Sequence, residues 1–476
     1  MRLKFFHTAA IVLASLAIAT SSFAASEGAN DAQSATAESA DAALITKGRY
    51  LATAADCAAC HTAQGGKPFS GGYPISSPLG TIYSTNITPS IQNGIGEYSE
   101  ADFSNALRKG IRRDGKHLYP AMPYTSYAQL TDDDVHALYV YFHNSVEAVN
   151  SKPPVTALPF PFNLRLAMVF WNTLYLSDTP YRPDPTESKL VNRGAYLANA
   201  LEHCAACHTP RDVMMGPESS LPLAGGSLGS WYAPNITSDK VAGIGGWSDA
   251  ELVQYLKTGS VPGKAQAAGP MAEAITHSLQ YLSDDDLSAI VAYLRQTKPI
   301  NDSGEPIPRF DHGAPLDESS MRGSKVAAQR GWQVFSGSCA ACHQANGGGL
   351  DNHDYPSLYH NSATGASNPD NLIATILFGL QRQSGNTTTF MPAFGSSASF
   401  TDQLSDKDVA DVSNFVLHQF GNANVTVTEE QVADVRKGGK PALLARVGHY
   451  AVPAVLVLLV LIVALGIFWL RKKKTH

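Results

Sequence analysis

The sequence has no excess of basic residues, few charges of either sign and no cysteine outside three short strings. Of 476 residues, 16% are charged and 44% are hydrophobic, proportions that exclude wholesale disorder. The net charge is −6, and it falls to −12 when Arg2, Lys4 and the four basic residues of the carboxy-terminal tail are set aside. The part of the chain between these two ends is therefore acidic. It lacks the basic surface that nucleic-acid binding needs, and its charge favours a partner protein with a basic face.

Long apolar runs are missing from the interior, which excludes a protein with many membrane spans. At the amino terminus, a basic head, a short apolar run and small residues up to position 24 predict a signal peptide over 1–24. This run is too short for a membrane anchor. The following segment, 25–43, is rich in Ala, Ser, Glu and Asp and is predicted to be a disordered lead-in. We therefore expect an exported protein.

The carboxy terminus carries one apolar run that is long enough to span a bilayer. Residues 451–470 are uncharged, so they predict a single transmembrane helix that follows a juxtamembrane segment over 423–450. The tail, 471–476, begins with four basic residues, which stay on the cytoplasmic side of a membrane. We expect a protein of the bacterial inner membrane whose body lies in the periplasm.

All six cysteines lie in three copies of one five-residue string, so the disulfides that an exported chain normally forms are not expected. The strings are Cys57-Ala58-Ala59-Cys60-His61, Cys204-Ala205-Ala206-Cys207-His208 and Cys339-Ala340-Ala341-Cys342-His343. Two cysteines three residues apart can bond to the two vinyl groups of one haem, and the adjacent histidine then binds the iron. A zinc site or a redox-active dithiol is the alternative, but neither needs this histidine three times. Three covalent c-type haems are therefore predicted.

A longer repeat surrounds each string. A short helix with a glycine and an aromatic residue precedes it, at Gly48 to Ala52, Gly194 to Ala198 and Gly331 to Phe335. A closing helix follows, and capping boxes are predicted to open it at Thr131 to Asp134, Ser283 to Asp286 and Ser405 to Asp408. The repeats predict a mainly α protein with one-haem domains over 44–150, 188–300 and 323–422, a proline-rich connector over 151–187 and a second connector over 301–322.

The second axial ligand of each iron is predicted to be a methionine in an irregular segment ahead of the closing helix. A thioether fills the site and raises the reduction potential, as suits a haem that only carries electrons. The candidates are Met122, Met271 and Met391. Histidine could replace methionine as this ligand, and the available residues are His117, His136, His143, His203, His277, His353 and His360.

The three strings, the paired Asn-Ile-Thr loops at Asn86 and Asn235, the Leu118 to Tyr124 segment and Met391-Pro392-Ala393-Phe394 resemble one family. It is the tri-haem cytochrome c subunit of bacterial membrane-bound alcohol and sugar dehydrogenases. The resemblance implies three tandem class I cytochrome c domains that take electrons from a large dehydrogenase subunit and deliver them to ubiquinone. It also implies that the partner holds a flavin or pyrroloquinoline quinone and that a small third subunit can be present. The chain itself would not act on the organic substrate.

Two questions stay open at this stage. The connector stretch Pro159 to Leu176 is apolar and aromatic, which fits either a helix packed between the first two domains or a surface that meets the membrane or a partner. As alternatives to the dehydrogenase subunit, the chain could be a multihaem peroxidase-like enzyme or a tethered cytochrome that serves a terminal oxidase.

Overall fold

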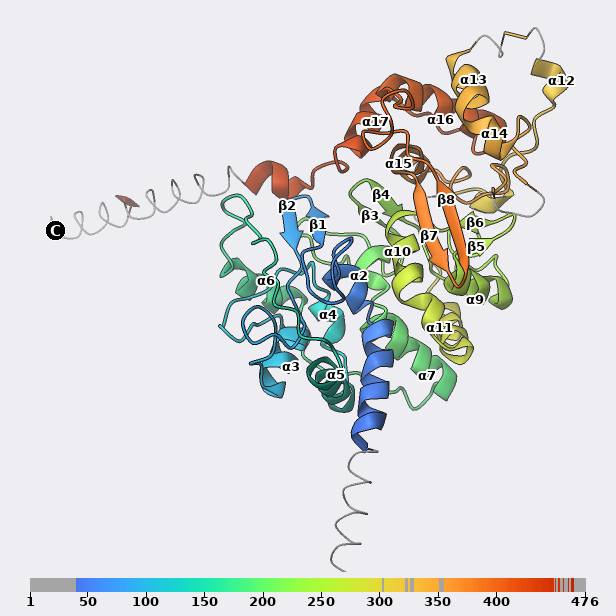
Figure 1. Cartoon of the computed structure of the whole chain (residues 1–476). Coiled ribbons are helices and arrows are strands. Elements are labelled where there is room, and N and C mark those ends of the chain that lie inside the picture. Colours follow the sequence, from blue (N-terminus) through green and yellow to red (C-terminus); the bar gives the residue numbers. More distant parts are fainter. Residues whose placement is uncertain are drawn as a thin grey trace, which may run out of the picture.

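The computed structural model describes residues 40–301, 304–321, 324–325, 329–350 and 355–448, together with isolated positions between 450 and 465. Short helices joined by long loops dominate this part of the chain (Figure 1), which confirms the prediction of a mainly α protein. Four two-stranded antiparallel hairpins also occur, and they were not predicted. Their strands have two to five residues, too few for the alternating pattern that identifies a strand in a sequence.

Each repeat contains a haem string, one or two hairpins and a closing helix. In the first, residues 40–54 are helical and are followed by α2 (Cys57–His61), β1 (Pro74–Ser77), β2 (Gly80–Tyr83), α3 (Glu100–Lys109), α4 (Tyr124–Tyr127) and α5 (Asp132–Asn144). The second contains α7 (Lys189–Tyr196), η1 (Leu197–Leu201), α8 (Ala205–His208), β3 (Gly226–Leu228), β4 (Trp231–Ala233), α9 (Asp249–Thr258), β5 (Ser260–Val261), β6 (Ala265–Gln266), α10 (Gly269–His277), η2 (Leu279–Tyr281) and α11 (Asp284–Gln296). The third contains α13 (Arg330–Val334), η4 (Phe335–Cys339), α14 (Ala340–His343), α15 (Asp370–Phe378), β7 (Leu380–Ser384), β8 (Thr387–Met391) and α16 (Asp406–Phe420).

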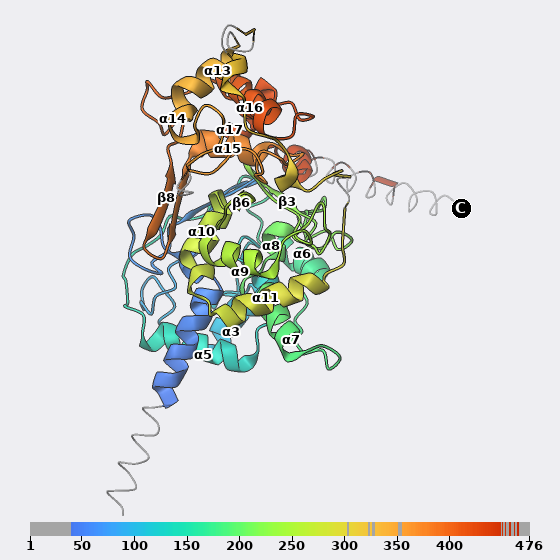
Figure 2. The ribbon, with the colours of Figure 1, turned by 90° about the vertical axis from the view of Figure 1, so that its right-hand side faces the viewer.

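In the described part of the chain, further helices lie outside these repeats, among them a helical stretch over 443–448. The others include α6 (Ala167–Tyr175) in the first connector, η3 (Arg309–Asp311) and α12 (Glu318–Met321) in the second, and α17 (Glu429–Arg436) after the third repeat. The third repeat sits above the other two in both views (Figures 1 and 2). Residues 1–39 and nearly all of 451–476 lie outside the described part, so the signal peptide, most of the lead-in, the transmembrane helix and the tail stay predictions. Among the described residues, no helix is both long and apolar enough to cross a bilayer.

A glycine lets the opening and closing helices of each repeat touch backbone to backbone. A Cβ atom on Gly194 would lie 1.8 Å from the carbonyl oxygen of Ala289 in α11. At Gly48 and Gly331 the corresponding distances to α5 and α16 are 2.1 Å and 2.4 Å. Any side chain at these positions would force the helices apart. The glycine that recurs before each haem string therefore sets the distance between the two helices that frame it.

The first two repeats are joined by a reciprocal pair of hydrogen bonds and share one continuous core. The Tyr50 hydroxyl donates to Asp286 at 2.5 Å, and the Tyr196 hydroxyl donates to Asp134 at 2.5 Å. Each tyrosine belongs to the opening helix of one repeat, and each acid belongs to the closing helix of the other. A bond to a charged group contributes about 1.5–3 kcal/mol. Buried residues from Leu51 to Leu294 form a single cluster across this junction.

The same bonds explain why the first two predicted capping boxes are only half formed. Ser283, like the other two predicted caps, accepts the expected backbone bond from the acid three residues later. The return bond was predicted wrongly for Asp134 and Asp286, because Asp134 accepts from Lys47 and Tyr196, and Asp286 accepts from Arg193 and Tyr50. In the third repeat, Asp408 accepts from the hydroxyl of its cap at 2.8 Å. Complete capping boxes occur instead at α3 and α9.

The third repeat has its own core and is attached to the second through the hairpin β7–β8. Buried residues of α13, α15, α16 and α17 form this second cluster. Arg382 of β7, which is 2% exposed, donates to the carbonyl of Ala267 at 2.7 Å and to the side chain of Gln266 at 2.9 Å. These contacts place β7 against α10 of the second repeat.

The close crossing of the two helices predicts that a side chain at the glycine lowers the free energy of unfolding. Replacing Gly194 by Ala should cost about 3 kcal/mol, the upper end for overpacking, because the new methyl group meets backbone and not a flexible side chain. Gly263→Ala is the matched control in the same domain, since a Cβ there meets nothing within 4 Å and the cost is limited to about 1 kcal/mol for its left-handed backbone. Thermal unfolding monitored by circular dichroism would measure both. Equal losses in the two variants would show that the crossing is loosely packed.

Candidate haem sites

The three haem strings form short helices in equivalent positions. The strings lie in α2, α8 with Cys204 before it, and α14 with Cys339 before it. Asp56 and His203, directly ahead of the first two strings, have left-handed backbone conformations that turn the chain into the haem helix. All six cysteines are free thiols of intermediate exposure. Each pair therefore lies on a single helical turn with both sulfur atoms available.

Each histidine of the strings is oriented by a backbone carbonyl. Because a carbonyl oxygen only accepts, Nδ1 of each ring is the donor, and Nε2 keeps its lone pair for a metal. Burial lowers the pKa of all three imidazoles, which keeps them neutral as an iron ligand must be. The bonds run from His61 to Thr85 (2.6 Å), from His208 to Pro234 (2.6 Å) and from His343 to Pro356 (3.0 Å).

The Asn-Ile-Thr loops hold the first two of these carbonyls in place, a role that the sequence alone did not reveal. Asn86, which follows Thr85, accepts from the backbone and hydroxyl of Thr88 at 2.9 and 2.7 Å and donates to the carbonyl of Val149 at 2.7 Å. Asn235 makes the same set of bonds in the second repeat. The signal was the recurrence of the tripeptide 25 residues after His61 and 27 residues after His208. These asparagines tie the histidine's partner to the end of the domain.

The predicted methionine ligands pack against the same cores as the strings. Met122 and Met271 lie partly buried against the core shared by the first two repeats, as Cys57 and Cys204 do. Met391 lies against the core of the third repeat, as Cys339 does. Iron ligation by the three methionines stays a prediction.

The expectation of an irregular segment is correct only for Met122, which lies in a bend ahead of α4. Met271 stands in the first turn of α10, where Pro270 is pre-organised for a helix start, and Met391 ends strand β8. In the second and third repeats, the predicted methionine ligand is therefore held at the end of a helix or strand and not in a loop.

Most of the alternative histidines already have partners. His136, His143 and His360 bind protein oxygens through ring nitrogens. His203 is buried against the ring of Tyr127, and burial lowers its pKa to about 4. Of the remaining three, His353 lies outside the described residues, His277 is an exposed residue of α10, and His117 lines a pocket between α3 and α6.

The residues at each site fit a covalently bound haem. Burial raises the pKa of Cys57, Cys60, Cys204 and Cys339 to about 12, as expected of cysteines that face an apolar interior. Each site also offers an imidazole with a free Nε2 and a thioether on the same core. A bound haem supplies an iron that gains and loses one electron. Among the described residues, no cluster of three or more His, Cys, Asp or Glu is arranged for another metal.

Helix α10 brings the three sites together. It begins with the segment that carries Met271, it contacts α2 of the first site, and it packs against β7, whose partner strand β8 ends at Met391. The views in Figures 1 and 2 agree that α10 lies beside this hairpin. One helix of nine residues therefore touches elements of all three haem sites.

Three acidic side chains are gathered between the first two strings. Burial raises the pKa of Asp56 well above its usual value, and the charges of Glu202 and Glu273 raise it further. Burial also raises the pKa of Glu202 to about 8, although the carboxylate accepts from Ser278 at 2.9 Å. The charges of Asp56 and Glu273 also raise the pKa of Cys60, which places this acidic cluster against the first haem string.

The raised pKa of Glu202 predicts how the stability of the protein depends on pH. A carboxyl whose pKa is higher in the folded than in the unfolded state binds more protons when folded, so its contribution to stability is lost as the pH rises from about 4.5 to about 8. Glu202→Gln removes this loss. The variant should match the natural protein near pH 5 and exceed it by on the order of 3 kcal/mol at pH 8. Thermal unfolding at both pH values tests this, with the exposed Glu430→Gln as control. A pH-independent difference would contradict it.

Comparison with known proteins agrees with this geometry. Residues 45–145, 191–298 and 328–420 each match the cytochrome c family model. The fructose dehydrogenase cytochrome subunit of Gluconobacter japonicus is 47% identical over 92% of this chain and 93% of that one. The gluconate 2-dehydrogenase cytochrome c subunit of Pantoea cypripedii is 38% identical over 84% and 91%, and the cytochrome c subunit of the quinone alcohol dehydrogenase of Gluconobacter oxydans is 37% identical over 86% and 85%. The chain therefore belongs to the cytochrome c family, and within it to the cytochrome c subunits of bacterial alcohol and sugar dehydrogenases.

Proposed function

We propose that this chain carries electrons, one at a time, through three covalently bound haems from a large dehydrogenase subunit to ubiquinone. The observation that carries the proposal is the threefold recurrence of one site: a pair of thiols, a histidine oriented through Nδ1 and a methionine on the same core. Three such sites around one helix form a chain of electron carriers.

The partner subunit follows from the relatives. Identity is 47% with a fructose dehydrogenase cytochrome subunit and 37% with that of a quinone alcohol dehydrogenase. We therefore favour a sugar dehydrogenase over an alcohol dehydrogenase as the electron donor. The acidic body of the chain offers a surface for a basic face of that subunit.

The membrane location rests on the two ends of the sequence. A predicted signal peptide over 1–24 and a predicted transmembrane helix over 451–470, followed by basic residues, would place the three haem domains in the periplasm at the inner membrane. In this location the haem domains would lie at the membrane surface, close enough to pass electrons to a membrane quinone.

The test uses the complex as isolated from membranes in detergent. We expect a large dehydrogenase subunit to copurify and one of the substrates fructose, gluconate or ethanol to reduce the haems, seen as the absorption of reduced haem c. Adding ubiquinone-1 should then reoxidise them. Fructose or gluconate is expected to act and ethanol is not.

Two outcomes would contradict the proposal. One is copurification with a terminal oxidase and no dehydrogenase subunit. The other is a haem that is oxidised by peroxide in preference to ubiquinone-1, which would favour a peroxidase-like enzyme.

A further inference from the structure

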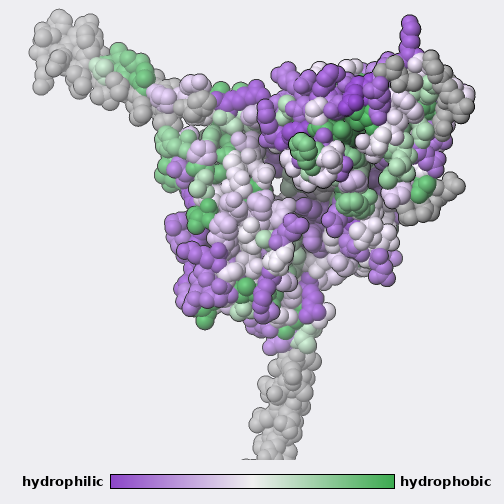
Figure 3. Space-filling model, turned by 45° about the horizontal axis from the view of Figure 1, so that its top comes forward, coloured by the Kyte–Doolittle hydropathy of each residue, from purple (hydrophilic) through white to green (hydrophobic). Residues whose placement is uncertain are grey.

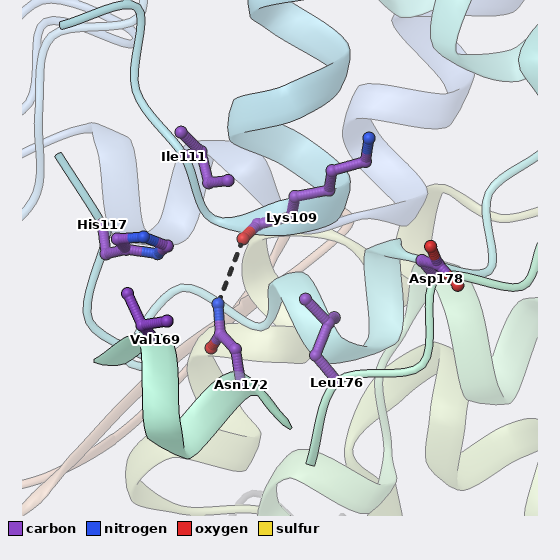
Figure 4. A pocket seen from close by; sticks show the side chains of 7 residues that line it. All are labelled: Lys109, Ile111, His117, Val169, Asn172, Leu176 and Asp178. Atoms are coloured by element: carbon purple, nitrogen blue, oxygen red, sulfur yellow. Dashed lines mark hydrogen bonds between the residues drawn. The ribbon is translucent and has the colours of Figure 1, made fainter. Parts of the chain in front are cut away.

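A pocket of about 370 Å³ lies between the first domain and connector helix α6 (Figure 4). Its volume is within the range of small-molecule sites. Part of its wall comes from the end of α3 and the loop after it, and the rest comes from α6 and the segment that follows. The lining residues are Lys109, Ile111, His117, Val169, Asn172, Leu176 and Asp178.

The lining combines an apolar surface with a buried polar atom that has no hydrogen-bond partner in the described part of the chain. Ile111, Val169 and Leu176 supply the apolar part. The amide of Asn172 is already bonded, since it accepts from the Tyr124 hydroxyl at 2.8 Å and donates to a backbone carbonyl at 3.4 Å. Nδ1 of His117, in contrast, is buried and has no hydrogen-bond partner among the described residues. A buried ring nitrogen without a partner is costly unless a ligand or water bonds to it.

The pocket adjoins the predicted sixth ligand of the first haem. Met122 lies in the chain between His117, which lines the pocket, and Tyr124, which bonds to the pocket residue Asn172. The ring of Tyr124 also packs edge-on against Trp171 of α6, with ring centres 6.3 Å apart. The segment that would bind the iron on one side therefore forms the pocket wall on the other.

The pocket also adjoins an apolar surface that leads to the predicted membrane anchor. The connector exposes large hydrophobic side chains at Phe160, Leu164, Leu166, Val169, Phe170 and Leu174. Phe162 lies against Gly448, three residues before the apolar run 451–470. Hydrophobic side chains gather on the side of the molecule from which the carboxy-terminal segment leaves (Figure 3). The predicted anchor over 451–470 therefore begins three residues after a contact with this connector.

We propose that this pocket binds the head group of ubiquinone, with Nδ1–H of His117 donating a hydrogen bond to one quinone carbonyl. The proposal rests on the proposed function, and it assigns the site at which ubiquinone would be reduced. A quinone ring is flat and largely apolar, and it carries two carbonyl oxygens at opposite positions. In Figure 4, His117 and Asp178 lie at opposite ends of the pocket. One carbonyl would therefore meet the imidazole N–H, and the other would lie at the exposed end, where solvent water can donate to it.

Quinone reduction needs a source for two electrons and two protons. Each ubiquinone takes up two electrons and two protons to become ubiquinol. A haem held by Cys57, Cys60, His61 and Met122 would supply these two electrons one at a time. Both protons come from solvent water, one through His117 and one at the exposed end of the pocket beside Asp178.

The experiment uses the complete complex in detergent with ubiquinone-1 as acceptor. His117→Ala should raise the KM for ubiquinone-1 about tenfold or more, because it removes the hydrogen bond to the quinone. Val169→Trp should do the same by filling the pocket. A photoreactive azido-ubiquinone should label peptides within 105–124 or 165–178 in the natural complex, and Val169→Trp should abolish that labelling.

Matched controls separate the pocket from general damage. Leu166→Trp adds the same side chain to the same connector at a position that is 80% exposed and outside the pocket, and His136→Ala removes an exposed histidine of the same domain. Both should keep natural kinetics and labelling. In all four variants, substrate should reduce the haems to the natural extent.

The outcomes distinguish the pocket from the proposed function. Natural ubiquinone-1 kinetics in both pocket variants, or labelling of other peptides, would overturn the pocket alone. Substrate-reduced haems that the natural complex never passes to ubiquinone-1 would overturn the quinone acceptor, and the pocket with it.

Discussion

The structure depends on one contact, the backbone-to-backbone crossing of the first and last helices in each repeat. Glycine at the crossing removes the side chain that would separate them, and the distances are similar in all three copies. The haem string follows directly after the crossing helix, so the crossing determines where the two thiols and the histidine stand. The segments between the two helices then supply the carbonyl that bonds to that histidine and the methionine that packs against the core.

Burial then determines the chemistry of each site. It lowers the pKa of His61, His208 and His343, which leaves them neutral and able to bind iron. The reciprocal bonds from Tyr50 and Tyr196 hold the first two domains together, while β7 attaches the third through Arg382. A relay of electron carriers needs such fixed spacing, since its parts must remain neighbours throughout turnover.

Much of this could be predicted from the sequence, because the information is local. Three five-residue strings and one glycine repeat predict three similar helical domains, and the mainly α class is confirmed. The bonds between domains could not be predicted, since the partner of Asp286 is Tyr50, 236 residues away. The predicted return bonds of the first two capping boxes were wrong for the same reason. The role of Asn86 and Asn235 was visible as a repeat but not as a function, because the carbonyl that they hold belongs to a neighbouring residue.

The most direct test of the account is to measure how many haems the mature protein holds and whether any of them is open to a ligand. The account predicts three covalent haems per chain by mass spectrometry, and a reduced protein that binds no carbon monoxide because a methionine occupies the sixth position of every iron. Fewer than three haems, or carbon monoxide binding by the intact reduced protein, would contradict it.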